Sequence, residues 1–291
     1  MDMPSPAPAA EETTPPFILT RPERQTIPVV FASPHSGRRY PLAFLAESRL
    51  DPHNLRRSED SFVEELYAAA PRLGAPLLAA TFPRVYCDAN REPWELDPTM
   101  FEEPLPEWVN SRSPRVGAGL GTIARIVANG EPVYRRRLRF AEAETRVRDC
   151  WQPYHAALAQ LIAETRAQFG RCLLIDCHSM PSYPGGGLMA DVVLGDAHGT
   201  ACSPKATRLV ETFLTGQGYR VRRNDPYAGG YVTRHYGRPR EQVHALQIEL
   251  ARGLYMNEAR IERASGFTHL QTNLTALIGL FTETDWAATL V

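Results

Sequence analysis

Short apolar runs alternate with longer stretches of helical periodicity along this chain. Four of the runs lie between turn residues and predict buried strands, over residues 28–33, 76–82, 171–177 and 190–194. Two further short strands are expected over residues 220–223 and 243–250. Strands of this kind are typical of a sheet that is covered by helices.

Helical patterns fill the intervals between these strands. Ser58 or Asp60 can cap a helix that ends at Gly74, and residues 131–168 carry a helical pattern interrupted at Pro153. Ser203 opens another helix as its N-cap, and a last helix is expected over residues 267–281. This alternation predicts an α/β fold, with one three-layer domain over residues 17–291 and helices on both faces of the sheet. Residues 1–16 are rich in proline and alanine and are expected to form a disordered tail.

Composition excludes several classes of protein. The chain has 291 residues, of which 43% are hydrophobic, and 32 Lys+Arg nearly balance 33 Asp+Glu. This balance argues against a nucleic-acid partner or an anionic membrane surface. The five cysteines form no CxxC pair, so neither a disulfide framework nor a zinc ribbon is indicated. With no signal peptide and no apolar stretch of membrane-spanning length, we expect a cytoplasmic protein.

Two histidines follow predicted strands. Asp176 and His178 share one side of their strand, and a polar residue at the carboxyl end of such a strand either binds a ligand or caps the loop. Cys177 and His178 point to opposite faces, which disfavours a nucleophile–base pair. His35 lies in a tight Pro- and Gly-containing loop after the first strand. These two histidines need one carboxylate to form a zinc site with an open position.

Carboxylates occur at two suitable places. Of Glu59 and Asp60, one is expected to stabilise a helix N-terminus and the other is free to face the sheet edge. Glu249 shares a face with Gln247 in a strand that is otherwise apolar, where an unpaired acid is costly. Glu249 is therefore either a structural partner of an arginine or a general base beside a metal-bound water.

Several arginines could hold an anionic substrate. Asn90 and Arg91 follow a strand and offer an amide beside a planar guanidinium, which suits a carboxylate. Arg234 and His235 are expected to lie in a glycine-flanked loop, where the backbone can approach a ligand closely. Arginines near a candidate zinc site predict a small anionic substrate.

The chain resembles the N-formylglutamate amidohydrolase family from residue 33 to about residue 258. The segments that carry the resemblance are residues 33–37 (SPHSG), 58–60 (SED), 88–93 (DANREP), 176–181 (DCHSMP), 229–239 (GGYVTRHYGRP), 247–249 (QIE) and 254–256 (LYM). The family is similar to zinc carboxypeptidases and aspartoacylase. The resemblance therefore implies a mixed sheet between helices and one catalytic zinc.

Site roles follow from the resemblance residue by residue. It implies that the zinc ligands are His35, His178 and a carboxylate, for which Asp60 is favoured over Glu59. This acid lies much farther from the first histidine than in zinc carboxypeptidases. Glu249 resembles the general base, and Arg84 lies near the position of an oxyanion-stabilising arginine.

The remaining roles concern the substrate. Asn90 and Arg91 resemble the carboxylate-binding pair, which Arg234 and His235 would complete. The implied reaction is hydrolysis of N-formyl-L-glutamate to L-glutamate and formate, a step of histidine catabolism in this family. The alternatives are a zinc hydrolase of another N-acyl amino acid or peptide, and a catalytically silent protein that binds an anionic metabolite.

Overall fold

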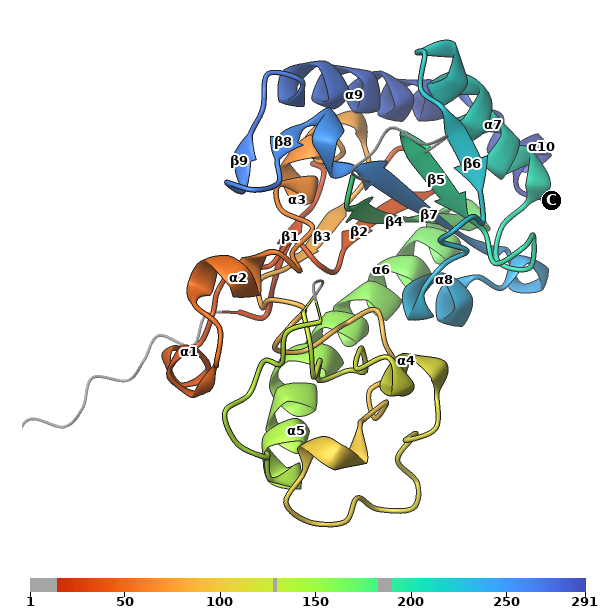
Figure 1. Ribbon diagram of the computed structural model, residues 1–291. Helices are drawn as coiled ribbons and strands as arrows, with labels where there is room; N and C mark the ends of the chain where they lie inside the picture. Colours follow the sequence, from red (N-terminus) through yellow and green to blue (C-terminus); the bar gives the residue numbers. More distant parts are fainter. Residues whose placement is uncertain (1–14, 128–129, 183–189) are drawn as a thin grey trace, which may run out of the picture.

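A seven-stranded mixed sheet occupies the centre of the computed structural model, which describes residues 15–127, 130–182 and 190–291 (Figure 1). The strand order is β1-β3-β2-β4-β7-β5-β6. The strands are β1 (Phe17–Thr20), β2 (Val29–Ser33), β3 (Leu77–Ala80), β4 (Cys172–Met180), β5 (Val192–Gly195), β6 (Val221–Arg223) and β7 (Val243–Ala251). β3, β2, β4 and β7 are mutually parallel neighbours, whereas β1 and β5 pair antiparallel with β3 and β7.

The six predicted strands are present, and β1 is an addition that the sequence reasoning missed. β1 is a short edge strand with alternating exposure. Its four residues are too few to show a clear strand pattern directly after the proline- and alanine-rich N-terminal segment. Most of the expected tail lies outside the described residues. The two described residues of that segment, Pro15 and Pro16, accept hydrogen bonds from Thr81 at 2.6 and 3.0 Å and are therefore fixed to the sheet.

Helices cover both faces of the sheet, as predicted. α3 (Val63–Leu66), α7 (Pro204–Gly216) and α9 (Phe267–Glu283) pack on one face, against a core that includes Leu173, Ile175 and Cys177 of β4. α6 (Gln152–Phe169) and α8 (Tyr231–Tyr236) cover the other face, where Cys172 and Leu174 are buried. The alternation of side chains along β4 thus separates the two cores.

Two predicted helices differ from the structure. Residues 131–139 are not helical; α5 (Phe140–Arg146) follows them and joins α6 through a π-helical turn, η3 (Val147–Trp151). Pro153 lies in the first turn of α6, where its missing N–H is tolerated. The helix expected before Gly74 is reduced to α3 and the 3₁₀ turn η1 (Pro71–Leu73). It does not begin at Ser58 or Asp60, because Phe62, directly before α3, adopts a left-handed conformation (φ 68°).

A long excursion between β3 and α5 lies below the sheet in Figure 1. It packs in two small cores, one of which also includes Phe44 and Leu55. It contains η2 (Pro98–Met100) and α4 (Pro114–Gly117), and part of it lies beside the ends of β4 and β7. The remaining elements are short: α1 (Leu42–Glu47), α2 (Pro52–Arg56), η4 (Pro239–Glu241), η5 (Arg252–Leu254), β8 (Met256–Asn257), β9 (Glu262–Arg263) and α10 (Trp286–Thr289). No helix in the described part of the chain is long and apolar enough to cross a bilayer.

Candidate active site

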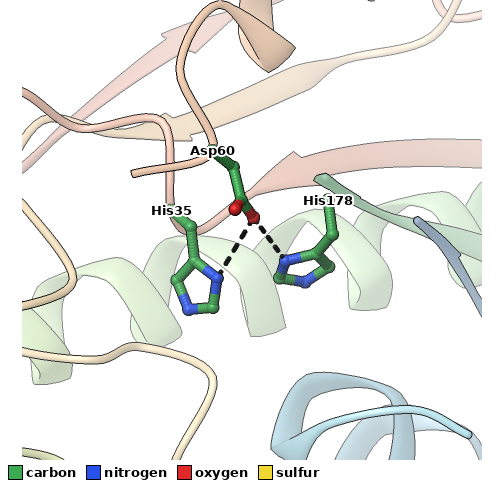
Figure 2. A group of neighbouring side chains, drawn as sticks. All are labelled: His35, Asp60 and His178. Carbon is green, nitrogen blue, oxygen red and sulfur yellow. Dashed lines mark hydrogen bonds and ion pairs between the residues drawn. The ribbon is translucent and has the colours of Figure 1, made fainter. Parts of the chain in front are cut away.

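Two histidines and one aspartate meet at the carboxyl ends of β2 and β4 (Figure 2). Asp60 Oδ2 lies 3.3 Å from His35 Nδ1 and 3.0 Å from His178 Nδ1. All three side chains are buried, and their candidate ligand atoms lie within 4.8 Å of one another. The structure therefore gathers the residues that the sequence analysis expected to meet, from three separate segments of the chain.

Two further carboxylates orient the imidazole rings from outside. His35 Nε2 lies 2.7 Å from Asp88 Oδ1, and His178 Nε2 lies 2.8 Å from Asp176 Oδ1. Because a carboxylate only accepts, the outer aspartates favour a proton on each Nε2, while each Nδ1 faces Asp60. Carboxylate partners of this kind are typical of metal-binding histidines.

Electrostatics keep this cluster charged. Burial opposes ionisation of the Asp60 carboxyl, but its contacts with His178 and His35 outweigh this effect and hold the pKa of Asp60 well below its usual value. Burial also opposes protonation of His178, yet Asp176 raises the pKa of His178 well above its usual value. A metal ion that binds here must displace that proton, so its affinity depends on pH.

Glu59 and Asp60 have separate surroundings despite being neighbours. Glu59 accepts hydrogen bonds from Tyr40 Oη at 2.9 Å, Arg56 Nε at 3.1 Å and Ser61 Oγ at 2.9 Å. Its carboxylate is thus occupied by the protein itself. Asp60 is the member of the pair that reaches the histidines.

Glu249 stands beside His178 on the neighbouring strand. The parallel register of β4 and β7 places Glu249 opposite His178 and Gln247 opposite Asp176, so all four side chains share one face. Gln247 Nε2 donates to Glu249 Oε1 at 2.9 Å. Burial raises the pKa of Glu249 to about 7, with His178 opposing the shift and Asp60 adding to it. Among the described residues, no arginine lies within ion-pair distance of Glu249.

A cavity of about 330 Å³ opens beside these groups. His35, His178 and Glu249 line it, together with the predicted Asn90. Five arginines line it as well: Arg57, Arg84, Arg91, Arg115 and Arg252. The sequence reasoning missed Arg57, Arg115 and Arg252. Arg252 had a detectable signal, because it directly follows the strand that carries Glu249, whereas the other two lie in segments without strand periodicity.

Arg84 and Arg91 are held by the protein on the cavity wall. Arg84 Nη2 lies 2.9 Å from Asp88 Oδ2, so this guanidinium supports the carboxylate that orients His35. Arg91 Nε donates to Leu120 O and its Nη1 donates to Asn90 O, each at 2.9 Å.

The amide of Asn90 is equally well fixed. Asn90 Oδ1 accepts from Val232 N at 2.8 Å, which leaves Nδ2 3.1 Å from His178 Nε2. The predicted pair of Asn90 and Arg91 thus borders both the cavity and the histidine cluster.

Arg234 and His235 are not brought to this cavity, which departs from their expected role. The glycine-flanked segment forms α8, whose Val232 and Thr233 face inward while Arg234 and His235 are exposed. Thr233 Oγ1 donates to Asp176 Oδ2 at 3.1 Å, and the His235 ring stacks on Tyr231 with centroids 4.8 Å apart. Residues that follow one another in a helix point to different sides. Since Val232 and Thr233 face the core, Arg234 and His235 face solvent.

A His–Asp–His cluster that faces a buried glutamate at the end of an α/β sheet belongs to the class of candidate metallohydrolase centres. Comparison with known proteins also indicates a hydrolase. Residues 27–256 match the family model for N-formylglutamate amidohydrolase. The chain is 33% identical over 243 residues to the N-formylglutamate deformylase of Pseudomonas aeruginosa, which covers 81% of this chain and 85% of that protein. This chain belongs to the N-formylglutamate amidohydrolase family.

Other relatives support the same family assignment. The N-formylglutamate deformylase of Pseudomonas putida is 31% identical over 238 residues, covering 80% of this chain and 83% of that protein. The crystal structure of N-formylglutamate amidohydrolase from Ralstonia eutropha superposes with a TM-score of 0.87 at 41% identity, over 93% of this chain and 98% of that one. A gene product of Agrobacterium tumefaciens shares the fold, with a TM-score of 0.69 at 18% identity. The predicted α/β fold and the family resemblance are both confirmed.

Proposed function

We propose that this chain is a zinc-dependent amide hydrolase that converts N-formyl-L-glutamate and water to L-glutamate and formate. The observation that carries the proposal is the position of Glu249 beside the His35–Asp60–His178 cluster, in a cavity lined by arginines. The names of the relatives support the choice of substrate. The substrate partner is thus a small anionic N-acyl amino acid.

The donor set suits zinc. Two imidazole nitrogens and one carboxylate oxygen are the ligands of many catalytic zinc sites, which keep one position open. His35 Nδ1 supports this choice, because it is buried and has no hydrogen-bond partner in the structure. His35, Asp60 and His178 would hold the ion. A bound zinc would supply Lewis acidity, which polarises the formyl carbonyl and acidifies a water molecule.

Glu249 is the proposed general base. Its pKa of about 7 is suited to accepting a proton from water near neutral pH. The resulting hydroxide adds to the formyl carbon, and Glu249 returns the proton to the glutamate nitrogen as the C–N bond breaks. Arg84 lines the same cavity and would supply positive charge for the developing oxyanion.

Arginines and Asn90 would hold the substrate. Among the residues that the structure describes, five arginines and two acids, Asp88 and Glu249, line the cavity, so the wall favours an anion. Arg91 is the proposed clamp for a substrate carboxylate, and Asn90 Nδ2 offers a donor next to the histidines. Arg234 and His235 are left out of this assignment because of their exposed position on α8.

The decisive experiment combines metal analysis with a formate-release assay. Purified protein should contain about one zinc per chain, release formate from N-formyl-L-glutamate, lose this activity with a chelator and regain it with zinc. Faster hydrolysis of N-acetyl-L-glutamate or of a neutral N-formyl amino acid would indicate a different acyl-amino-acid hydrolase. A folded, zinc-loaded protein that binds N-formyl-L-glutamate without releasing formate would indicate a catalytically silent binding protein.

A further inference from the structure

The five cavity arginines differ in how far the protein already neutralises them. Arg84 pairs with Asp88 at 2.9 Å, and Arg252 pairs with Asp60 at 3.1 Å. Arg57 and Arg115 are exposed, and neither forms an ion pair with a carboxylate in the described part of the chain. Their charges are therefore available to a ligand.

Arg115 also stands beside a second arginine. Burial lowers the pKa of Arg91; Asp88 and Glu95 oppose this shift, and the neighbouring charges of Arg84 and Arg115 add to it. Arg84 has Asp88 as its counterion, whereas Arg115 forms no ion pair in the described part of the chain, so Arg115 adds a positive charge beside Arg91 without a counterion of its own. Two cations that repel one another on a cavity wall are stabilised by an anion that contacts both.

The hydrogen bonds of Arg91 limit the donors that this guanidinium offers to a ligand. Its Nε and Nη1 already donate to the carbonyl oxygens of Leu120 and Asn90. Arg91 therefore cannot present its Nε–Nη2 edge as a bidentate fork to a carboxylate. Arg115 lines the same cavity and can provide the missing donors.

Position along the cavity indicates which carboxylate this pair would bind. The His–Asp–His cluster is buried, whereas Arg115 in α4 is exposed and so stands at the mouth. A substrate whose formyl group reaches the buried cluster keeps its side-chain carboxylate, the charged group farthest from the formyl carbon, near the mouth. Resting on the proposed function, we propose that Arg115, together with Arg91, binds the side-chain carboxylate and makes the site selective for acidic N-acyl amino acids.

The test compares N-formyl-L-glutamate with N-formyl-L-glutamine, which has nearly the same size and lacks the side-chain charge. Arg115→Gln should lower kcat/KM for the glutamate substrate about tenfold or more, mainly through KM, and leave that for the glutamine substrate nearly unchanged. Arg115→Lys should restore part of the loss, because it keeps the charge without the planar fork. An unchanged ratio of the two kcat/KM values in Arg115→Gln overturns the proposal.

The matched control is Arg112→Gln. Arg112 is exposed in the same segment but does not line the cavity, so its replacement should leave the substrate ratio at the wild-type value. If the ratio of kcat/KM for the glutamate substrate to that for the glutamine substrate fell equally in both variants, the cause would be the loss of any positive surface charge. This result would also overturn the proposal.

Binding separates this inference from the proposed function. If the wild-type protein hydrolyses neither formyl substrate, the proposed function fails, but the clamp can still be tested by calorimetry with glutarate and butyrate on the zinc-loaded protein. Tighter binding of glutarate than of butyrate, with the difference lost in Arg115→Gln, supports the clamp. Equal affinities of the wild type for the two acids, or equal glutarate affinities of wild type and variant, overturn it.

Discussion

The guanidinium of Arg252 holds one oxygen of Asp60 while the other faces both histidines. Arg252 Nη2 lies 3.1 Å from Asp60 Oδ1, and its remaining nitrogens donate to Ser179 Oγ at 3.2 Å and Arg57 O at 3.1 Å. The carboxylate therefore cannot rotate away from the cluster without breaking a buried ion pair.

Replacing this arginine should weaken metal binding. We expect Arg252→Met to lower zinc affinity by about 10–100-fold, because Asp60 loses the group that orients it. Arg252→Lys should lose less, since it retains the charge. Chelator competition measures the affinity, with circular dichroism as a check on folding. Wild-type zinc affinity in a folded Arg252→Met protein would contradict the role assigned to this ion pair.

Asp60→Asn and Glu59→Gln should have opposite phenotypes. Asp60→Asn removes a proposed ligand charge and should lose most of the bound zinc along with activity. Glu59→Gln should keep its zinc, because Glu59 is occupied by Tyr40, Arg56 and Ser61, but should unfold more easily by about 1–2 kcal/mol. Metal content and urea denaturation of both variants measure this contrast. Zinc loss in Glu59→Gln alone would reverse the assignment.

Glu249→Gln should separate proton transfer from metal binding. The amide keeps the size of the side chain but cannot accept a proton, so kcat should fall by about 10²–10⁴ while zinc content stays at one per chain. Formate release and metal analysis on the same preparation measure both. Near-normal turnover in the folded, zinc-loaded variant would end the general-base mechanism.

The pH profile should report the same residue. A general base must be ionised, so kcat/KM should rise with pH through the pKa of Glu249, which burial raises to about 7. A bound dication lowers that pKa, so the midpoint of the acidic limb should fall at or below this value. The limb should be absent in Glu249→Gln. An identical acidic limb in the variant would assign the titration to another group.

The free energy of unfolding should fall as the pH rises, whereas kcat/KM should increase. The folded-state pKa of Glu249 lies above its unfolded value of 4.5, so the fold binds this proton more tightly. Its contribution to stability is complete below pH 4.5 and is lost as the pH rises to about 7. In metal-free protein, Glu249→Gln should therefore gain stability relative to wild type, by about 1–3 kcal/mol, between these pH values. Urea denaturation at both pH values measures the difference, and a constant offset would contradict it.

Gly230 should be intolerant of a side chain. A Cβ at this position would lie 2.3 Å from Asn90 Nδ2 and 2.4 Å from Asn90 Oδ1. Since Asn90 is held by Val232 and borders His178, Gly230→Ala should lower kcat/KM about tenfold or more by displacing this amide. Gly279→Ala in α9 is the matched control, because nothing lies within 4 Å of its added carbon. Equal kinetics of the two variants would show that Asn90 need not stay in place.

The sequence could predict the parts of the site that follow strand periodicity. His35, His178 and Glu249 lie in or directly after apolar strands, so alternation and strand ends identified them. The choice between Glu59 and Asp60 needed the structure, because it depends on which carboxylate Arg56 and Tyr40 occupy.

Segments without periodicity explain the remaining differences. Arg115 comes from the excursion between β3 and α5, which packs in two small cores that bring distant residues together, and no local pattern encodes such contacts. Glycines around Arg234 suggested an open loop, yet the intervening residues form α8 and bury Thr233 instead. In both cases contacts between distant segments decided which side chains reach the cavity.

The pairing of β4 with β7 has a consequence for assembly of the sheet. If β7 slid by one position, Glu249 and Gln247 would turn into the layer that now holds Ile248 and Leu250. A carboxylate stranded among aliphatic side chains would lose its hydration without gaining a partner, which costs several kcal/mol. The side chains that are proposed to act in amide hydrolysis therefore also help to fix the strand register, because a shifted pairing of β7 would bury them without hydrogen-bond partners.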